Sequence, residues 1–204
     1  MGIDYHPDAN PARIADWIGK GLKATLAESE NIAITVPGGS TPFPVFEKLV
    51  AQPLDWSRIT VWPGDDRIVP EDHAASNTGR IRALFEPAGA KVQALRENAV
   101  PPPFALTWVG MGMDGHIASL FPNTDPLASD ASTVLRLTPD PLPPEAPFDR
   151  LTLTIAGLVR TDAVMVMIRG AEKAKVFAAA AKGESDTPVA RFLAATQAPV
   201  TCFT

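Results

Sequence analysis

His116 and Asp114 lie two positions apart in the segment GMGMDGHIASLFP, residues 110–122, which follows an apolar run typical of a strand. An imidazole can accept a proton from water at neutral pH, and a neighbouring carboxylate can orient its ring. Glycines in such a segment let backbone amides approach a ligand, because they carry no Cβ. The pattern predicts a general base on a loop; the alternative is a histidine with a purely structural role.

A second loop, PGGSTP at residues 37–42, follows the run IAITV. Its two glycines free the backbone, Ser40 and Thr41 offer hydroxyl groups and a helix cap, and Pro42 suits the first position of a helix. Exposed amides at a helix start attract phosphate. The loop predicts a phosphate site, although an ordinary strand-to-helix turn remains possible, and no lysine follows as a Walker motif requires.

A third loop lies within WPGDDRIVPEDHAASN, residues 62–77, where Arg67 follows Asp65 and Asp66. A guanidinium group can hold a phosphate or a carboxylate through two hydrogen bonds, or it can pair with adjoining acids. The alternative is an exposed polar loop in which Ser76 only caps the next helix.

Two basic positions lie near other predicted elements. Arg150 immediately precedes an apolar run, and Lys173 lies early in a predicted helix, where the helix dipole disfavours a cation. Such charged side chains are usually solvated, but an anionic ligand would explain a lysine so early in a helix.

Other chemistries fit the sequence less well. The glycines of residues 110–115 form a literal G-x-G-x-x-G, but Pro122 interrupts the helix that a dinucleotide site needs. Ser40 and Ser119 are conceivable nucleophiles, yet neither lies in G-x-S-x-G, so direct attack by water is the simpler mechanism. Three histidines without H-E-x-x-H argue against a metal site.

Alternating elements must position these loops. Helical spacing of apolar residues covers residues 11–29, and strand-like runs occupy residues 32–36, 59–62, 105–109, 151–155, 164–168 and 200–203. This alternation predicts an α/β fold of Rossmann-like kind, with a doubly wound, mostly parallel sheet and helices on both faces. Ligands bind such sheets at the carboxyl ends of the strands, so the loops 37–42, 63–77 and 110–122 should share one crevice.

Length and composition limit the possible classes of protein. We expect residues 1–204 to form a single domain in which the proline-rich stretches 101–104 and 139–148 are loops. A net charge of −5 argues against a nucleic-acid partner, and no apolar run is long enough to cross a membrane. One cysteine permits no intramolecular disulfide, and the N-terminus does not resemble a signal peptide. We therefore expect a cytoplasmic monomer.

Taken together, the segments PGGSTP, GDDRIVPEDHAASN, GMGMDGHIASLFPNTDPL, RLTLT and RGAEKAK resemble the 6-phosphogluconolactonase family in order and separation, over roughly residues 32–177. The resemblance implies a fold like that of glucosamine-6-phosphate isomerase/deaminase. It also implies cofactor-free hydrolysis of 6-phospho-D-glucono-1,5-lactone to 6-phosphogluconate in the oxidative pentose phosphate pathway.

The resemblance implies roles for single residues. His116 matches the family's general base, Asp114 the acid beside it, and Arg67 the arginine of an Asp-Glu-Arg motif. The predicted substrate and phosphate contacts are Gly38, Gly39, Ser40, Thr41, Asp65, Arg150 and Lys173. Two departures stand out, because Asp66 replaces the usual glutamate and Ile117 replaces a common threonine. Any role that needs the longer side chain at position 66 is therefore in question.

Two further functions stay open at this point. A sugar-phosphate isomerase/deaminase needs an additional carboxylate, and the sibling family reads AFNEP where this chain has ASLFP, with Phe121 in place of the glutamate. This difference favours the lactonase. A sugar-phosphate-binding regulator without turnover is the other alternative, and intact Asp114, His116 and Arg67 count against it.

Overall fold

The structure, a computed structural model, describes residues 2–144 and 146–204. Within this part of the chain, seven parallel strands form the central sheet in the order β1-β10-β9-β6-β2-β3-β5. Their bounds are β1 (Ile3–His6), β2 (Ile32–Val36), β3 (Ile59–Pro63), β5 (Lys91–Val92), β6 (Leu106–Val109), β9 (Val164–Met167) and β10 (Val200–Phe203). The predicted parallel sheet is therefore confirmed.

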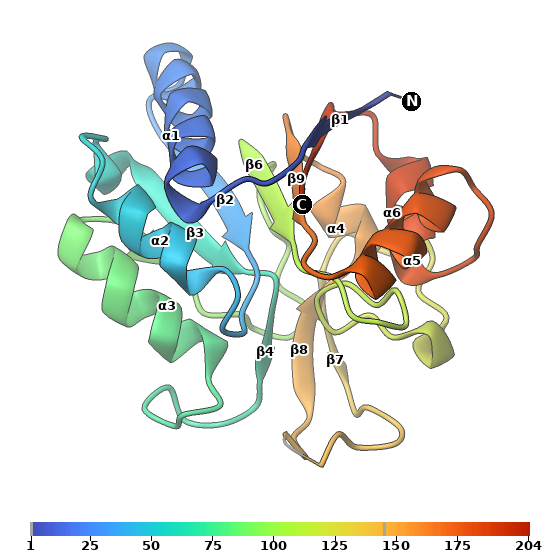
Figure 1. Cartoon of the computed structure of the whole chain (residues 1–204). Helices are drawn as coiled ribbons and strands as arrows, with labels where there is room; N and C mark the ends of the chain where they lie inside the picture. The colour runs from blue at the N-terminus through green and yellow to red at the C-terminus, as the bar shows by residue number, and fades with distance from the viewer. Residues whose placement is uncertain (1, 145) are drawn as a thin grey trace.

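Helices cover both faces of this sheet (Figure 1). One group consists of α1 (Pro11–Glu28), α2 (Phe43–Val50) and α3 (Asn77–Phe85), and the other of α4 (Ile155–Leu158), α5 (Ala171–Ala181) and α6 (Pro188–Ala195). Short 3-10 helices cover Trp56–Arg58, Glu86–Ala88 and Pro122–Thr124. The predicted helix at residues 11–29 corresponds to α1, which begins where Asn10 Oδ1 accepts a hydrogen bond from the Arg13 amide at 2.9 Å.

The alternation of β2 explains the two layers of core. Ile32, Ile34 and Val36 pack with the apolar faces of α1, α2 and α3, whereas Ala33 belongs to the core on the other side, with α4, α5 and α6. All five residues of β2 are buried, as expected for a strand in the middle of a parallel sheet.

A second, three-stranded sheet lies below the central one in Figure 1, with β8 (Arg150–Leu153) between β4 (Asp65–Arg67) and β7 (Val134–Leu137). Both pairings are antiparallel. The expectation that residues 151–155 belong to the parallel sheet is therefore wrong. The run also ends early, because the Thr154 hydroxyl accepts from the Gly157 amide and starts α4.

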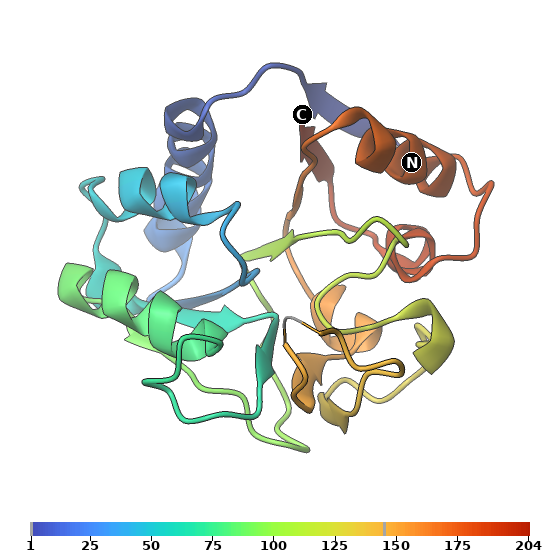
Figure 2. The same ribbon diagram turned by 60° about the horizontal axis from the view of Figure 1, so that its bottom comes forward.

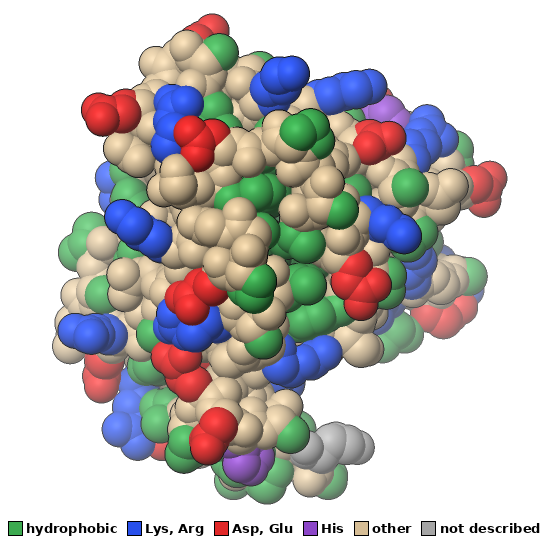
Figure 3. All heavy atoms as spheres, turned by 90° about the vertical axis from the view of Figure 1, so that its left-hand side faces the viewer, with side chains coloured by type: hydrophobic (Ala, Val, Ile, Leu, Met, Phe, Trp, Pro, Cys, Tyr) green, Lys and Arg blue, Asp and Glu red, His purple; other side chains and the backbone are tan. Residues whose placement is uncertain are grey.

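Charged side chains are mixed over the face formed by α1, α2 and α3, where Figure 3 shows cations and anions interspersed. Among the described residues, no helix combines the length and apolarity that spanning a membrane requires.

Candidate active site

The three predicted loops meet in one cleft of about 450 Å³ at the carboxyl ends of the parallel strands. In Figure 2 the loops that follow β2, β3 and β6 approach one another near the centre of the molecule. The cleft is lined by Pro37, Gly38, Gly39, Thr41, Pro42, Asp65, Arg67, Asn77, Trp108, Gly110, Met111, Gly112, His116, Ala118, Ser119, Phe121, Pro143, Ala146, Arg150, Met167, Arg169 and Lys173. The shared crevice expected from the strand order is confirmed.

His116 lines this cleft, and its ring is held by Asp114. The imidazole Nδ1 donates to Asp114 Oδ1 at 2.7 Å, and the His116 amide donates to the same oxygen at 3.2 Å. Burial alone raises the pKa of Asp114, but the charge and hydrogen bonds of His116 outweigh it and lower this pKa below its usual value. With Nδ1 engaged by a carboxylate, Nε2 is the ring nitrogen available for proton transfer. Asp114 itself does not line the cleft.

Gly112 leaves the space that the His116 ring fills. A Cβ at position 112 would lie 2.2 Å from both Cε1 and Nδ1 of His116, closer than atoms can approach. The loop is closed by a hydrogen bond from the Gly112 amide to the His116 carbonyl, at 2.9 Å. Phe121 covers the ring from another side, with its centroid 4.9 Å away. The position of the imidazole therefore depends on a residue without a side chain.

The loop 37–42 presents free backbone amides to the cleft. Gly39 adopts φ +82°, and a Cβ at Gly38 would overlap the side chain of Asn77. Among the hydrogen bonds of the described residues, none is donated by the amides of residues 38–41. Such amides are suited to an anionic ligand.

The predicted cap of the following helix is wrong, because α2 begins at Phe43 with Pro42 in the N-cap position and no side-chain cap. Proline residues at positions 42 and 44 place the chain in helical geometry without one. Thr41 lines the cleft as predicted, whereas Ser40 is absent from its described lining.

Arg67 and Arg150 lie opposite each other on β4 and β8, and both line the cleft. Arg67 Nη1 donates to Ala75 O at 3.1 Å and to Asn77 Oδ1 at 3.0 Å. Its Nε is buried and has no partner among the described residues. Among the described residues no carboxylate forms an ion pair with Arg67. Its guanidinium group is therefore not held in place by the adjoining Asp65 and Asp66.

Arg150 is 3% exposed and donates to the carbonyls of Phe148 and Ala146, both at 2.9 Å. Burial lowers the pKa of its guanidinium, and the charge of Arg67 lowers it further. Two facing cations at one wall favour binding of an anion between or beside them.

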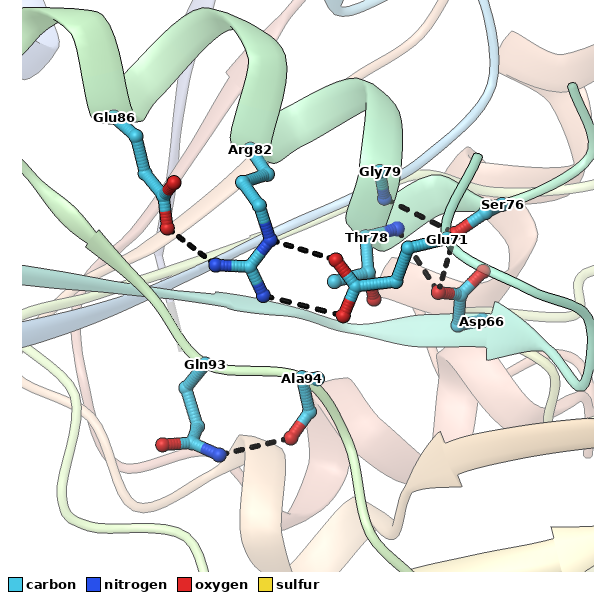
Figure 4. A network of polar contacts seen from close by, with 9 residues as sticks. All are labelled: Asp66, Glu71, Ser76, Thr78, Gly79, Arg82, Glu86, Gln93 and Ala94. Carbon is cyan, nitrogen blue, oxygen red and sulfur yellow. Dashed lines mark hydrogen bonds and ion pairs between the residues drawn. The ribbon is translucent and has the colours of Figure 1, made fainter. Parts of the chain in front are cut away.

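Asp66 has a structural role that its short side chain serves well. Its carboxylate accepts from the amides of Asn77 and Thr78 at 2.6 and 2.9 Å and from the Ser76 hydroxyl at 3.2 Å. Figure 4 shows it at the start of α3, where Ser76 also caps the helix by accepting from Gly79. Asp66 thus satisfies the first amides of α3 and ties this helix to β4, which carries Arg67.

Asp65, by contrast, lines the cleft and is half-buried. Burial raises its pKa above the usual value, an effect opposed by the hydrogen bond from Ser119 Oγ to Asp65 Oδ2 and by the charge of Arg67. The Asn77 amide group also donates to Asp65 Oδ1, at 3.3 Å. Ser119 is thereby occupied as a donor and is 1% exposed, which disfavours it as a nucleophile.

Lys173 reaches the cleft from α5 and donates to Met111 O at 2.7 Å. Three further lining residues carry side-chain hydrogen-bond donors and are not among the site residues predicted from the sequence, namely Asn77, Trp108 and Arg169. Among the described residues the cleft is lined by four Lys or Arg side chains and one carboxylate, Asp65, in a chain of net charge −5. This local excess of positive charge matches an anionic ligand.

The segment after β6 does not have the geometry of a dinucleotide-binding motif. After β6 the chain makes tight turns through residues 111–120 and then only the short 3-10 helix at Pro122–Thr124, so no helix receives a dinucleotide phosphate there. Among residues 2–144 and 146–204, no three His, Cys, Asp or Glu side chains gather as a ligand set for a metal ion.

The chain matches known proteins over nearly its whole length. The family model described as "Glucosamine-6-phosphate isomerases/6-phosphogluconolactonase" matches residues 6–99 and 85–201. A 6-phosphogluconolactonase of Pseudomonas aeruginosa is 36% identical, over 92% of this chain and 87% of that protein. Another, from Neisseria meningitidis serogroup A, is 34% identical, over 89% of this chain and 88% of that protein.

Among solved structures, a 6-phosphogluconolactonase from Shewanella baltica superimposes with a TM-score of 0.83 at 23% identity, covering 100% of this chain and 97% of that one. This likeness supports the fold. The match to the family model extends from the N-terminal elements into β10 and includes all three loops of the cleft. The chain therefore belongs to the family of glucosamine-6-phosphate isomerases and 6-phosphogluconolactonases.

Proposed function

We propose that this chain hydrolyses 6-phospho-D-glucono-1,5-lactone to 6-phosphogluconate, the lactonase step of the oxidative pentose phosphate pathway. The observation that carries the proposal is the oriented pair of Asp114 and His116 in the same cleft as the free amides of residues 38–41 and an excess of cations. A base at one end and an anion site at the other match a substrate with an ester and a phosphate. The relatives named 6-phosphogluconolactonase support the same reading.

His116 acts as the general base in this mechanism. Its Nε2 takes a proton from a water molecule as that water attacks the lactone carbonyl, and Asp114 accepts the hydrogen bond from Nδ1 and stabilises the imidazolium that forms. The tetrahedral intermediate then expels the ring oxygen, which recovers the proton from His116. The products are a hydroxyl group and a carboxylic acid on one open chain, and the acid loses its proton to solvent to become the carboxylate.

Arg67 stabilises the oxyanion of that intermediate. The amides of Gly112, Gly115 and His116 are already donated within the loop, which leaves them unable to serve a ligand. Arg67 Nε lies at the cleft without a partner among the described residues. A guanidinium next to a developing negative charge lowers the barrier because the charge is new in the transition state.

The phosphate is held by the amides of the loop 37–42, by Thr41 and by Lys173, with Arg150 adding positive charge. These contacts with the phosphate, remote from the reacting carbonyl, orient the lactone over His116. They are the same in the ground state and in the transition state. Asp65 contacts substrate hydroxyl groups and not the phosphate, because a charged carboxylate repels a phosphate. Hydrogen bonds from Ser119 and Asn77 hold its carboxyl group in place at the cleft.

An isomerase or deaminase activity is the second candidate, because the family includes both. It needs a further carboxylate to support the histidine, and here the Phe121 ring lies against His116 instead. Phe121 therefore favours the lactonase.

One assay separates the candidates. Freshly generated 6-phosphogluconolactone and glucosamine 6-phosphate are supplied separately, and acid release is followed in the first and ammonia and fructose 6-phosphate in the second. We expect acid release well above spontaneous hydrolysis and no ammonia. Ammonia release would identify a deaminase, and binding of both compounds without turnover would identify a regulator.

We also propose that residues 1–204 act as one 6-phosphogluconolactonase-like domain, as a monomer, in the cytoplasm. In support of a single domain, β1 and β10, from the two ends of the described chain, pair in the same sheet, and the cleft is lined by segments between residues 37 and 173. The single cysteine, Cys202, is buried and free.

A further inference from the structure

Trp108 on β6 combines two properties that rarely occur together. The residue is among those that line the cleft although it is only 1% exposed. Its indole Nε1 is buried and has no hydrogen-bond partner among the described residues. Leaving such a donor unpaired costs about 1–3 kcal/mol, and nearly all buried polar groups are paired. A ligand bound in the cleft can supply the partner that this buried donor lacks.

Few buried side-chain polar atoms lack a hydrogen-bond partner in this structure. In the part of the chain that the structure describes they are Thr35 Oγ1, Arg67 Nε and Trp108 Nε1. Two of the three belong to residues that line the cleft. Unmet polar atoms are thus concentrated where a ligand binds, which is typical of a site that is completed by its substrate.

The neighbours of Trp108 place it at the phosphate end of the cleft. Its ring packs edge-to-face on Phe46, with centroids 5.1 Å apart, and Phe46 lies on α2, which directly follows the loop 37–42. β6 lies between β2 and β9, and these strands lead into that loop and into the segment with Arg169 and Lys173. Trp108 therefore lies on the strand between the one that leads into the glycine-rich loop and the one that leads into the two cations.

We propose that the indole N–H of Trp108 donates a hydrogen bond to a phosphate oxygen of the substrate, an inference that rests on the proposed lactonase function. The backbone amides and the cations supply charge-assisted contacts, and Trp108 adds a neutral, directional donor fixed by its packing. When a sugar without a phosphate binds, the indole N–H of Trp108 stays unpaired. Trp108 therefore also contributes to discrimination against unphosphorylated lactones.

The test is Trp108→Phe, which keeps an aromatic ring against Phe46 and removes only the donor. We expect KM for 6-phosphogluconolactone and the inhibition constant of 6-phosphogluconate to rise together, by about three- to tenfold. We expect kcat to stay within about twofold, because the contact is the same in ground and transition states. Turnover of unphosphorylated glucono-1,5-lactone should not change.

The matched control is Trp62→Phe. Trp62 is also buried, at 8% exposure, but it lies in the core on the other face of the sheet and outside the cleft lining. We expect unchanged constants for this variant. An equal effect of both substitutions, an unchanged KM in Trp108→Phe, or the same change with the unphosphorylated lactone would each overturn the inference.

A second measurement needs no substitution at position 108. The chain has four tryptophans, so the indole N–H signals in a ¹⁵N spectrum can be assigned from Phe variants of the other three. Saturating 6-phosphogluconate should shift the Trp108 signal, and gluconate at equal concentration should not. An unmoved Trp108 signal at saturation would mean that the donor faces the Phe46 ring and would refute the proposal. A wild-type chain without lactonase turnover would instead refute the proposed function.

Discussion

Replacing His116 with alanine is expected to lower kcat for lactone hydrolysis by about 10²- to 10⁴-fold, the contribution of a well-placed general base. KM should change little, because the imidazole meets the attacking water and the phosphate is held by other residues. The reason is geometric, since the hydrogen bond of Nδ1 to Asp114, at 2.7 Å, leaves Nε2 available for proton transfer in a residue that lines the cleft. Steady-state kinetics, corrected for spontaneous hydrolysis, provide the measurement.

The chain offers a close control for this substitution. His6 forms the same kind of pair, with Nε2 at 2.7 Å from Asp4 Oδ2, at the edge strand β1 and outside the cleft lining. His6→Ala should therefore keep full turnover. Retention of wild-type kcat by His116→Ala, or an equal loss in both variants, would contradict the role of His116 as base.

Replacing Gly112 with alanine is expected to lower kcat by about 10²-fold, since a displacement of about 1 Å in a catalytic group can cost that much. The new Cβ would lie 2.2 Å from two atoms of the His116 ring and 2.7 Å from Asp114 Oδ1, so the imidazole must move. Binding of the phosphate should persist, and KM should stay near the wild-type value. Kinetics together with urea unfolding separate displacement of the ring from loss of the fold.

Two comparisons make the Gly112 prediction specific. A Cβ at Gly21, in α1, meets nothing within 4 Å, so Gly21→Ala should leave kcat unchanged and stabilise the helix by about 0.5–1 kcal/mol. If Gly112 acts only through the ring, then adding Gly112→Ala to His116→Ala should cause no further loss of kcat. A large additional loss in the double variant would show that Gly112 serves another purpose.

The meeting of three distant loops could be predicted from the sequence because it depends only on strand order. Strands that run parallel end at the same edge, so the segments after residues 36, 63 and 109 had to converge there. The pairing of His116 with Asp114 was equally accessible, since both lie in one short loop. Strand order and the spacing of residues within one loop decide these two features, so they can be predicted without knowledge of contacts between distant residues.

The direction of the strand at residues 150–153 could not be predicted in this way. Its apolar alternation is the same in a parallel or an antiparallel sheet, and only the contacts with β4 and β7 decide its place. Likewise, the cap expected from Ser40 and Thr41 followed from residue preference, which two prolines around Phe43 overrode.

Arg169, Asn77 and Trp108 were missed because their roles depend on long-range geometry. Arg169 lies in the segment RGAEKAK, which the sequence already marked, and its tether to Ala9 O at 2.6 Å joins residues far apart in the chain. Trp108 lies two residues before the segment 110–122, and this position is the one sequence feature that could have identified it. That its donor is unpaired emerges only when all its neighbours are placed.

In the proposed function, one cleft holds the phosphate on the loop 37–42 while His116 faces the lactone carbonyl. A crystal structure with bound 6-phosphogluconate is the decisive measurement. We expect a product carboxylate oxygen within about 2.6–3.2 Å of His116 Nε2. We also expect the phosphate on the amides of residues 38–41 with Lys173 beside it. A phosphate bound next to His116, or a product bound away from this loop, would refute the proposed arrangement.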